Sequence, residues 1–181
     1  WDQPSRANVH RMEAPLFSTV GDTLRSRLQA SLTDEKRESA SYDIKTLFEL
    51  VGEVNMREDE MFILDGIPHI IDFKSGFGSN EKGNTLRLQT VGHAYKLWNP
   101  DTKLFLLVRQ EQNNNYLNVI KRSELWDVRC GDLAYDAIDE FTGSNLRKVR
   151  GEVIDFQSDL SNKFWNDLSS QLSDLTSYLR W

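Results

Sequence analysis

The stretch Glu60-Met-Phe-Ile-Leu-Asp-Gly-Ile-Pro-His-Ile-Ile-Asp-Phe-Lys74 decides the fold of this chain. Asp65-Gly66 is a strong type I′ turn signal between two runs rich in Ile, Phe and Leu, so the stretch predicts a β-hairpin. Counting outward from this turn places Asp59 opposite Asp72, at a non-hydrogen-bonded pair. Two carboxylates that face each other with Cβ atoms roughly 4.5–5.5 Å apart repel, and a hard divalent cation removes that penalty. The hairpin register therefore predicts a metal site.

Alternation of side chains divides this hairpin into two faces. One face carries Asp72 and Lys74 together with Ile70 and is expected to carry the chemistry. The other is expected to pack in the core and consists of Phe62, Leu64, Ile67, Ile71 and Phe73. His69 falls beside Phe62, which favours a buried histidine over a metal ligand.

Asp59 followed by Asp72-Phe73-Lys74 resembles the D…(D/E)-x-K signature of the PD-(D/E)XK nuclease superfamily, in particular type II restriction endonuclease-like proteins. The Pro-Asp dipeptide is absent, because Glu58 precedes Asp59. The resemblance implies an α/β (α+β) fold with an αβββαβ core, a central mixed sheet flanked by helices. It also implies a Mg²⁺-dependent endonuclease that hydrolyses phosphodiester bonds in DNA and leaves a 5′-phosphate, with Asp59, Asp72 and Lys74 as the catalytic residues.

Asp59 and Asp72 offer hard oxygen ligands suited to Mg²⁺ or Mn²⁺, and the backbone carbonyl of Phe73 is a third candidate ligand. Lys74 would orient the attacking water and offset charge that develops on phosphorus. The superfamily usually supplies a further acid from the preceding helix. Residues 37–51 predict that helix, with an apolar stripe of Ile44, Leu47, Phe48 and Val51. The pattern assigns none of the nearby acids (Glu38, Asp43, Glu49 and Glu53) to the site.

A loop with three glycines spans residues 75–84, and Thr85 is a plausible N-cap for a helix that runs to about Trp98. The candidate nucleic-acid contacts in this region are Lys82, Arg87 and Gln89. Two relatives within the superfamily remain as alternatives, a RecB-type exonuclease and a viral cap-snatching RNA endonuclease. A further alternative is an inactive nuclease fold that binds nucleic acid or a partner protein.

The 181 residues, 39% of them apolar, suit one globular nuclease-like domain over residues 1–181. A single cysteine, Cys130, excludes a disulfide framework within the chain and favours a reducing compartment, the cytoplasm. No apolar run approaches the length of a membrane span, so no membrane partner is expected. The net charge of −6 is unusual for a DNA-binding protein, but positive residues gather at 74–96 and 147–150.

Around a core at about 37–121, the sequence predicts an N-terminal helix at 14–31 and a C-terminal helical extension at 123–181. Residues 103–108 and 116–120 read as strands, and residues 123–141 as mostly helical. The extension carries an apolar stripe formed by Leu160, Phe164, Leu168, Leu172, Leu175 and Leu179. This stripe packs on its own domain or forms a homodimer interface.

Overall fold

The hairpin forms as the sequence predicts. In the computed structural model, which describes residues 4–78, 82–110, 114–146, 148–149 and 156–171, β2 (Glu60–Leu64) pairs antiparallel with β3 (Ile67–Lys74). Asp65 and Gly66 both have positive φ, 53° and 77°, which is the backbone that a type I′ turn requires. The predicted register is confirmed along the paired part of the hairpin, from Leu64 opposite Ile67 to Glu60 opposite Ile71.

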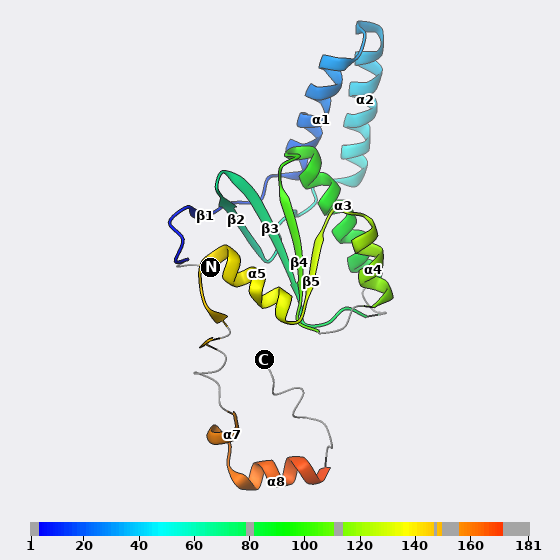
Figure 1. Ribbon diagram of the computed structural model, residues 1–181. Helices are drawn as coiled ribbons and strands as arrows, with labels where there is room; N and C mark the ends of the chain where they lie inside the picture. Colours follow the sequence, from blue (N-terminus) through cyan, green and yellow to red (C-terminus); the bar gives the residue numbers. More distant parts are fainter. Residues whose placement is uncertain (1–3, 79–81, 111–113, 147, 150–155, 172–181) are drawn as a thin grey trace.

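A five-stranded mixed sheet is built around this hairpin in the order β1-β2-β3-β4-β5 (Figure 1). The edge strand β1 (Val9–Arg11) pairs antiparallel with β2. On the other side, β4 (Lys103–Val108) pairs parallel with β3, and β5 (Asp127–Cys130) pairs parallel with β4. The class predicted from the sequence, α/β with a mixed sheet flanked by helices, is confirmed.

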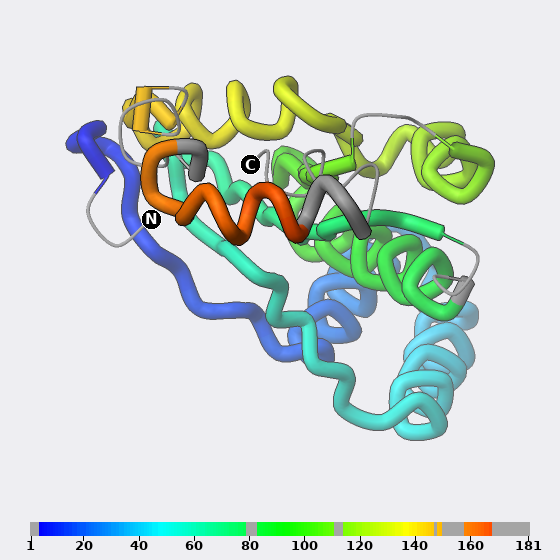
Figure 2. The backbone as a smooth tube through the Cα atoms, turned by 90° about the horizontal axis from the view of Figure 1, so that it is seen from below, coloured from blue at the N-terminus to red at the C-terminus, as the bar shows by residue number. Residues whose placement is uncertain are grey.

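Helices cover both faces of the sheet (Figures 1 and 2). On one face, α3 (Lys82–Trp98) and α4 (Asn115–Arg122) pack against residues such as Ile70 and Leu106. On the other face, α5 (Asp132–Thr142) packs against Phe62, Ile71 and Phe105. The hairpin face that carries Asp72 is therefore part of a packed layer as well. Burial on both faces explains why β4 is a continuous apolar run.

The core face of the hairpin is largely as expected. Phe62, Leu64 and Ile71 are buried, while Ile67 and Phe73 are half-buried. His69 is buried between the rings of Phe62 and Phe105, and burial lowers its pKa. This confirms His69 as a core histidine.

Two helices, α1 (Phe17–Ser31) and α2 (Asp34–Val51), form a hairpin that extends away from the sheet (Figure 1). Phe48 of the predicted α2 stripe packs against Phe17, with ring centroids 4.7 Å apart. Ile44 of the same stripe is half-buried, while Leu47 and Val51 are 57% and 51% exposed. Only part of the stripe is covered because α2 contacts mainly α1 and lies at the periphery.

Three further expectations are corrected. The strand expected at Tyr116–Ile120 is helix α4, because Asn114 accepts hydrogen bonds from the backbone N–H groups of Tyr116 and Leu117 and caps a helix. The helix expected over 123–141 begins only at Asp132, since residues 127–130 form strand β5. The αβββαβ core implied by the resemblance has a strand between the helix at 37–51 and the hairpin, but residues 52–59 form none, and β1 supplies the third antiparallel strand.

The C-terminal extension contains α7 (Phe156–Asp159) and α8 (Asn162–Gln171), which lie apart from the sheet in Figure 1. Phe164 of the predicted stripe is 44% exposed on α8. The side chain of Leu168 and all of Leu172, Leu175 and Leu179 lie outside the described residues, so the stripe stays a prediction. Among the helices of the described part, none is long and apolar enough to cross a membrane.

Candidate functional site

The candidate site begins where β2 and β3 stop pairing. Continued pairing beyond Glu60 and Ile71 would direct the backbone N–H of Phe73 to the carbonyl of residue 58. Instead, this N–H donates to Oδ2 of Asp59 at 2.7 Å. The side chain of Asp59 thus takes the place of a backbone acceptor and ends the ladder, which lets the preceding residue turn inward.

That preceding residue is Glu58, whose side chain is only 2% exposed. The backbone beside it is held from the opposite layer by Tyr95 of α3. Its hydroxyl donates to the carbonyl of Met56 at 2.5 Å, and both residues are buried. The contact between Tyr95 and Met56 fixes the segment that delivers the Glu58 carboxylate to the interior.

Glu58 and Asp72 share one arginine. The guanidinium of Arg87, on α3, donates through Nη1 to Oε1 of Glu58 at 2.6 Å and through Nη2 to Oδ2 of Asp72. Lys74 donates through Nζ to the other oxygen of Asp72 and to the carbonyl of Phe73, the latter at 3.2 Å. Two carboxylates and two cations therefore form one cluster at the carboxyl end of β3.

Burial differs sharply between the two signs of charge. The side chains of Asp72 and Glu58 are 1% and 2% exposed, whereas that of Arg87 is 38% exposed. Burial raises the pKa of Glu58 to about 7, and the negative charge of Asp72 adds to this rise, while Arg87 opposes it. Burial alone would lower the pKa of Arg87, but its bonds to Glu58 and Asp72 outweigh burial and raise it. The acids are held in the interior largely by this one cation.

The donor set suits a hard divalent cation. Mg²⁺ and Mn²⁺ prefer carboxylate and carbonyl oxygens as ligands. Glu58 and Asp72 are two buried carboxylates that already share a positively charged partner, and the carbonyl of Phe73 adjoins them. Glu58 and Asp72 would hold such an ion if Arg87 moved aside. Within the residues that the structure describes, no group of three or more His, Cys, Asp or Glu side chains is placed to hold a metal. Solvent or a substrate oxygen would have to supply the remaining ligands.

The structure brings together four of the residues predicted from the sequence, namely Asp72, the carbonyl of Phe73, Lys74 and Arg87. Arg87 was predicted to contact nucleic acid, but in the structure it bonds to the carboxylates themselves. Asp59, expected to face Asp72 across the hairpin, is exposed and accepts the N–H of Phe73 instead. We therefore assign the second carboxylate of the site to Glu58.

The other two expected nucleic-acid contacts lie on α3. Gln89 is half-buried, and residues two apart on a helix are rotated by about 200°, so it faces away from Arg87. Lys82 is the first residue of α3, and its side chain lies outside the described part.

Glu58 was missed because strand alternation places neighbouring residues on opposite faces, so only one of Glu58 and Asp59 could face Asp72 under regular pairing. The signal that would have found it is a pair of adjacent acids at the end of a strand, where pairing stops and alternation no longer holds. Two of the acids considered from the sequence have other partners. Glu49 of α2 pairs with Lys45, and Glu53, which follows the helix, accepts the backbone N–H of Phe17 at 2.6 Å.

The loop after β3 is fixed by contacts from the segment after β4. Phe77 is buried, its N–H donates to Oε1 of Gln110 at 2.8 Å, and its carbonyl accepts a hydrogen bond from Asn114. The backbone N–H of Arg109 also donates to the carbonyl of Lys74 at 2.8 Å. Residues 75–78 are thereby held next to the cluster, at the edge where β3 and β4 end, the usual place for ligands in parallel sheets.

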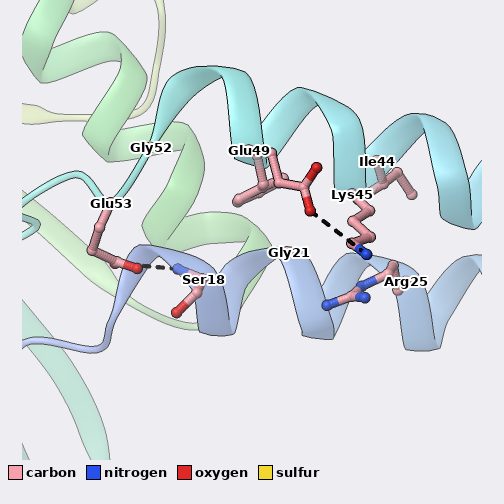
Figure 3. Close-up of a pocket in the computed structure, with 9 residues that line it drawn as sticks. Ser18, Gly21, Arg25, Ile44, Lys45, Glu49, Gly52 and Glu53 are labelled. Atoms are coloured by element: carbon pink, nitrogen blue, oxygen red, sulfur yellow. Dashed lines mark hydrogen bonds and ion pairs between the residues drawn. The ribbon is translucent and has the colours of Figure 1, made fainter.

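One cavity adjoins the cluster, and a second, larger cavity lies away from it. A polar cavity of about 100 Å³ adjoins Glu58 and Asp59 on the β1 side and is also lined by Arg11 and Arg57. A larger cavity of about 320 Å³ lies between α1 and α2, where Figure 3 shows the Lys45–Glu49 ion pair above Arg25. The larger cavity is lined only by residues of this helical hairpin and the two residues that follow it, and it contains no member of the cluster.

Comparisons with protein-family models, with curated proteins and with solved structures find no match for this chain. The geometry of the cluster therefore carries the functional argument by itself.

Proposed function

We propose that the protein is a Mg²⁺-dependent nuclease of restriction-endonuclease type, which hydrolyses phosphodiester bonds in DNA and leaves a 5′-phosphate. In this proposal Glu58 and Asp72 hold the metal, and Lys74 acts on the scissile phosphate. The observation that supports it is the cluster itself. Two buried carboxylates and a lysine meet where the hairpin ends, at the carboxyl edge of the parallel strands.

A bound Mg²⁺ would supply Lewis-acid polarisation of the phosphoryl group and a lower pKa for its water. The protein supplies the rest. Lys74 already bonds to Asp72, one of the two carboxylates that would hold the metal, so its ammonium can hold an attacking water or neutralise charge on the phosphoryl oxygens. The low exposure of both carboxylates strengthens these electrostatic interactions, because little water is present to screen them.

DNA is the proposed substrate because the more exposed members of the cluster are its two cations, although the chain as a whole carries −6. Arg87 and Lys74 are partly exposed at this edge, where each can contact a phosphate. A cytoplasmic location and a homodimer, which would supply two active sites for a duplex, belong to this proposal as well.

A cleavage assay tests the proposal. Supercoiled plasmid, linear duplex and RNA are each incubated with the protein in Mg²⁺ and in EDTA. Cleavage of DNA only in Mg²⁺ is expected, and D72A and K74A are expected to lower the rate by about 10²-fold or more. If the parent cuts none of the three substrates in Mg²⁺, the enzymatic proposal is wrong.

A matched pair of neighbouring variants tests the assignment of the second carboxylate. E58Q removes a buried acid of the cluster, whereas D59N alters the exposed acid that accepts the N–H of Phe73. We expect E58Q to abolish cleavage and D59N to retain it within a few-fold. The reverse order would return the metal-binding role to Asp59.

One observation favours a second function, an inactive nuclease fold that binds nucleic acid or a partner protein. Arg87 and Lys74 balance the two carboxylates without any metal, so the cluster is also a self-sufficient structural unit. Binding of a labelled duplex that is unchanged by Mn²⁺, with no cleavage of any substrate, would support this function.

A further inference from the structure

Arg87 occupies the place that a bridging cation would take. Its two Nη atoms bond to one oxygen of Glu58 and one oxygen of Asp72, so a metal shared by these carboxylates competes with the guanidinium for the same lone pairs. We propose that Arg87 is an internal cation that keeps the site closed to metal, and that it leaves the carboxylates for a phosphate of the nucleic acid when metal binds. This inference rests on the proposed nuclease function.

The side chain of Arg87 reaches solvent, whereas the two carboxylates are enclosed by protein. Its side chain is 38% exposed, while both carboxylates are nearly fully buried. Arg87 can therefore turn toward solvent without disturbing the sheet. Lys74 is 20% exposed and bonds to the other oxygen of Asp72, so it can remain in place during the exchange.

The charges make the exchange productive. With Arg87 in place and both acids ionised, two carboxylates are balanced by two cations. Replacing the guanidinium with a divalent ion leaves the buried cluster with one net positive charge, next to a released arginine. Each of these can attract a phosphate, and a guanidinium binds phosphate through two parallel hydrogen bonds.

Coupling between metal and nucleic acid follows. The apparent metal affinity of the free protein is the intrinsic affinity of the open site multiplied by the fraction of molecules in which Arg87 is away from the carboxylates. A phosphate that binds Arg87 raises that fraction, so nucleic acid tightens metal binding, and by reciprocity metal tightens binding of nucleic acid. Arg87 thus makes the site assemble on its substrate.

Mn²⁺ titration by calorimetry tests the inference without relying on cleavage. The test variant is R87Q, which keeps a polar side chain but lacks the charge. The matched control is R129Q, because Arg129 also bonds to two carboxylates, those of Asp127 and Glu140, away from the cluster. We expect R87Q to bind Mn²⁺ about tenfold or more tightly than the parent, and R129Q to bind as the parent does. A short non-cleavable duplex should tighten Mn²⁺ binding to the parent and much less to R87Q.

The outcomes separate the two proposals. If the parent binds Mn²⁺ and cleaves DNA, and R87Q binds Mn²⁺ with the same affinity as the parent, the proposed role of Arg87 is wrong and the nuclease proposal stands. Absence of Mn²⁺ binding by both proteins would overturn the nuclease proposal and this inference together. If R87Q folds neither with nor without Mn²⁺, R87K decides, because a single ammonium bridges the two acids poorly. Tighter Mn²⁺ binding by R87K supports the inference, and parent-like affinity refutes it.

Discussion

Glu58 should make the stability of the protein depend on pH in a way that E58Q removes. Burial raises its pKa from an ordinary value of 4.5 to about 7. Between about pH 4.5 and pH 7 the folded chain keeps a proton on Glu58 that the unfolded chain has released. The contribution of Glu58 to the free energy of unfolding is therefore full below about pH 4.5 and is lost as the pH rises through about 7. One pKa unit is about 1.4 kcal/mol, so the loss is about 3 kcal/mol.

The measurement is urea unfolding of the parent and E58Q in EDTA, at about pH 5 and about pH 8. The free energy of unfolding of E58Q, taken relative to the parent, should rise by about 2–3 kcal/mol between these two pH values. E49Q is the control, because Glu49 lies on an exposed face of α2 and pairs only with Lys45 among the described contacts. A change below about 0.5 kcal/mol for E58Q would show that Glu58 is not buried beside Asp72 in the folded protein.

Two predictions concern the packing around the site. A Cβ at Gly92 would lie 2.7 Å from Nε1 of Trp126, so G92A should lower the free energy of unfolding by about 1–3 kcal/mol. G83A is the control on the same helix and should not lower it, because there is open space around Gly83. N114A removes the cap of α4 and should cost about 1–2 kcal/mol in urea unfolding. N114D keeps the capping acceptor but, like N114A, loses the Nδ2 donor to the Phe77 carbonyl, so its loss should be the smaller of the two; an equal loss would assign the stabilisation to the Phe77 contact and not to the cap.

Local features of the sequence were sufficient to predict the hairpin. The Asp65-Gly66 turn admits one backbone geometry, and the apolar runs on either side then fix the register. The buried strand at 103–108 and the helix that ends at Trp98 also follow from local patterns, but the predicted N-cap at Thr85 was wrong, because the helix already begins at Lys82. Asp72 and Lys74 could be placed on one face by alternation alone.

Other elements depended on distant contacts. Residues 116–120 are compatible with either strand or helix, and the cap at Asn114 selects the helix. Asn114 is itself anchored to Phe77, which is 37 residues away in the chain. Short apolar segments are ambiguous in sequence because propensity differs little between the two states and tertiary contacts outweigh it.

The chain by itself determined a mixed α/β sheet, a hairpin of defined register and an acid and a lysine two residues apart on β3. Only the tertiary structure decided which second acid joins them. Tyr95 holds the Met56 carbonyl, and Asp59 accepts the N–H of Phe73, so regular pairing ends and Glu58 turns inward. Whether Glu58 or Asp59 joins the site depends on where the pairing of β2 and β3 ends. Helix α3, from another layer of the fold, helps to set that point through Tyr95.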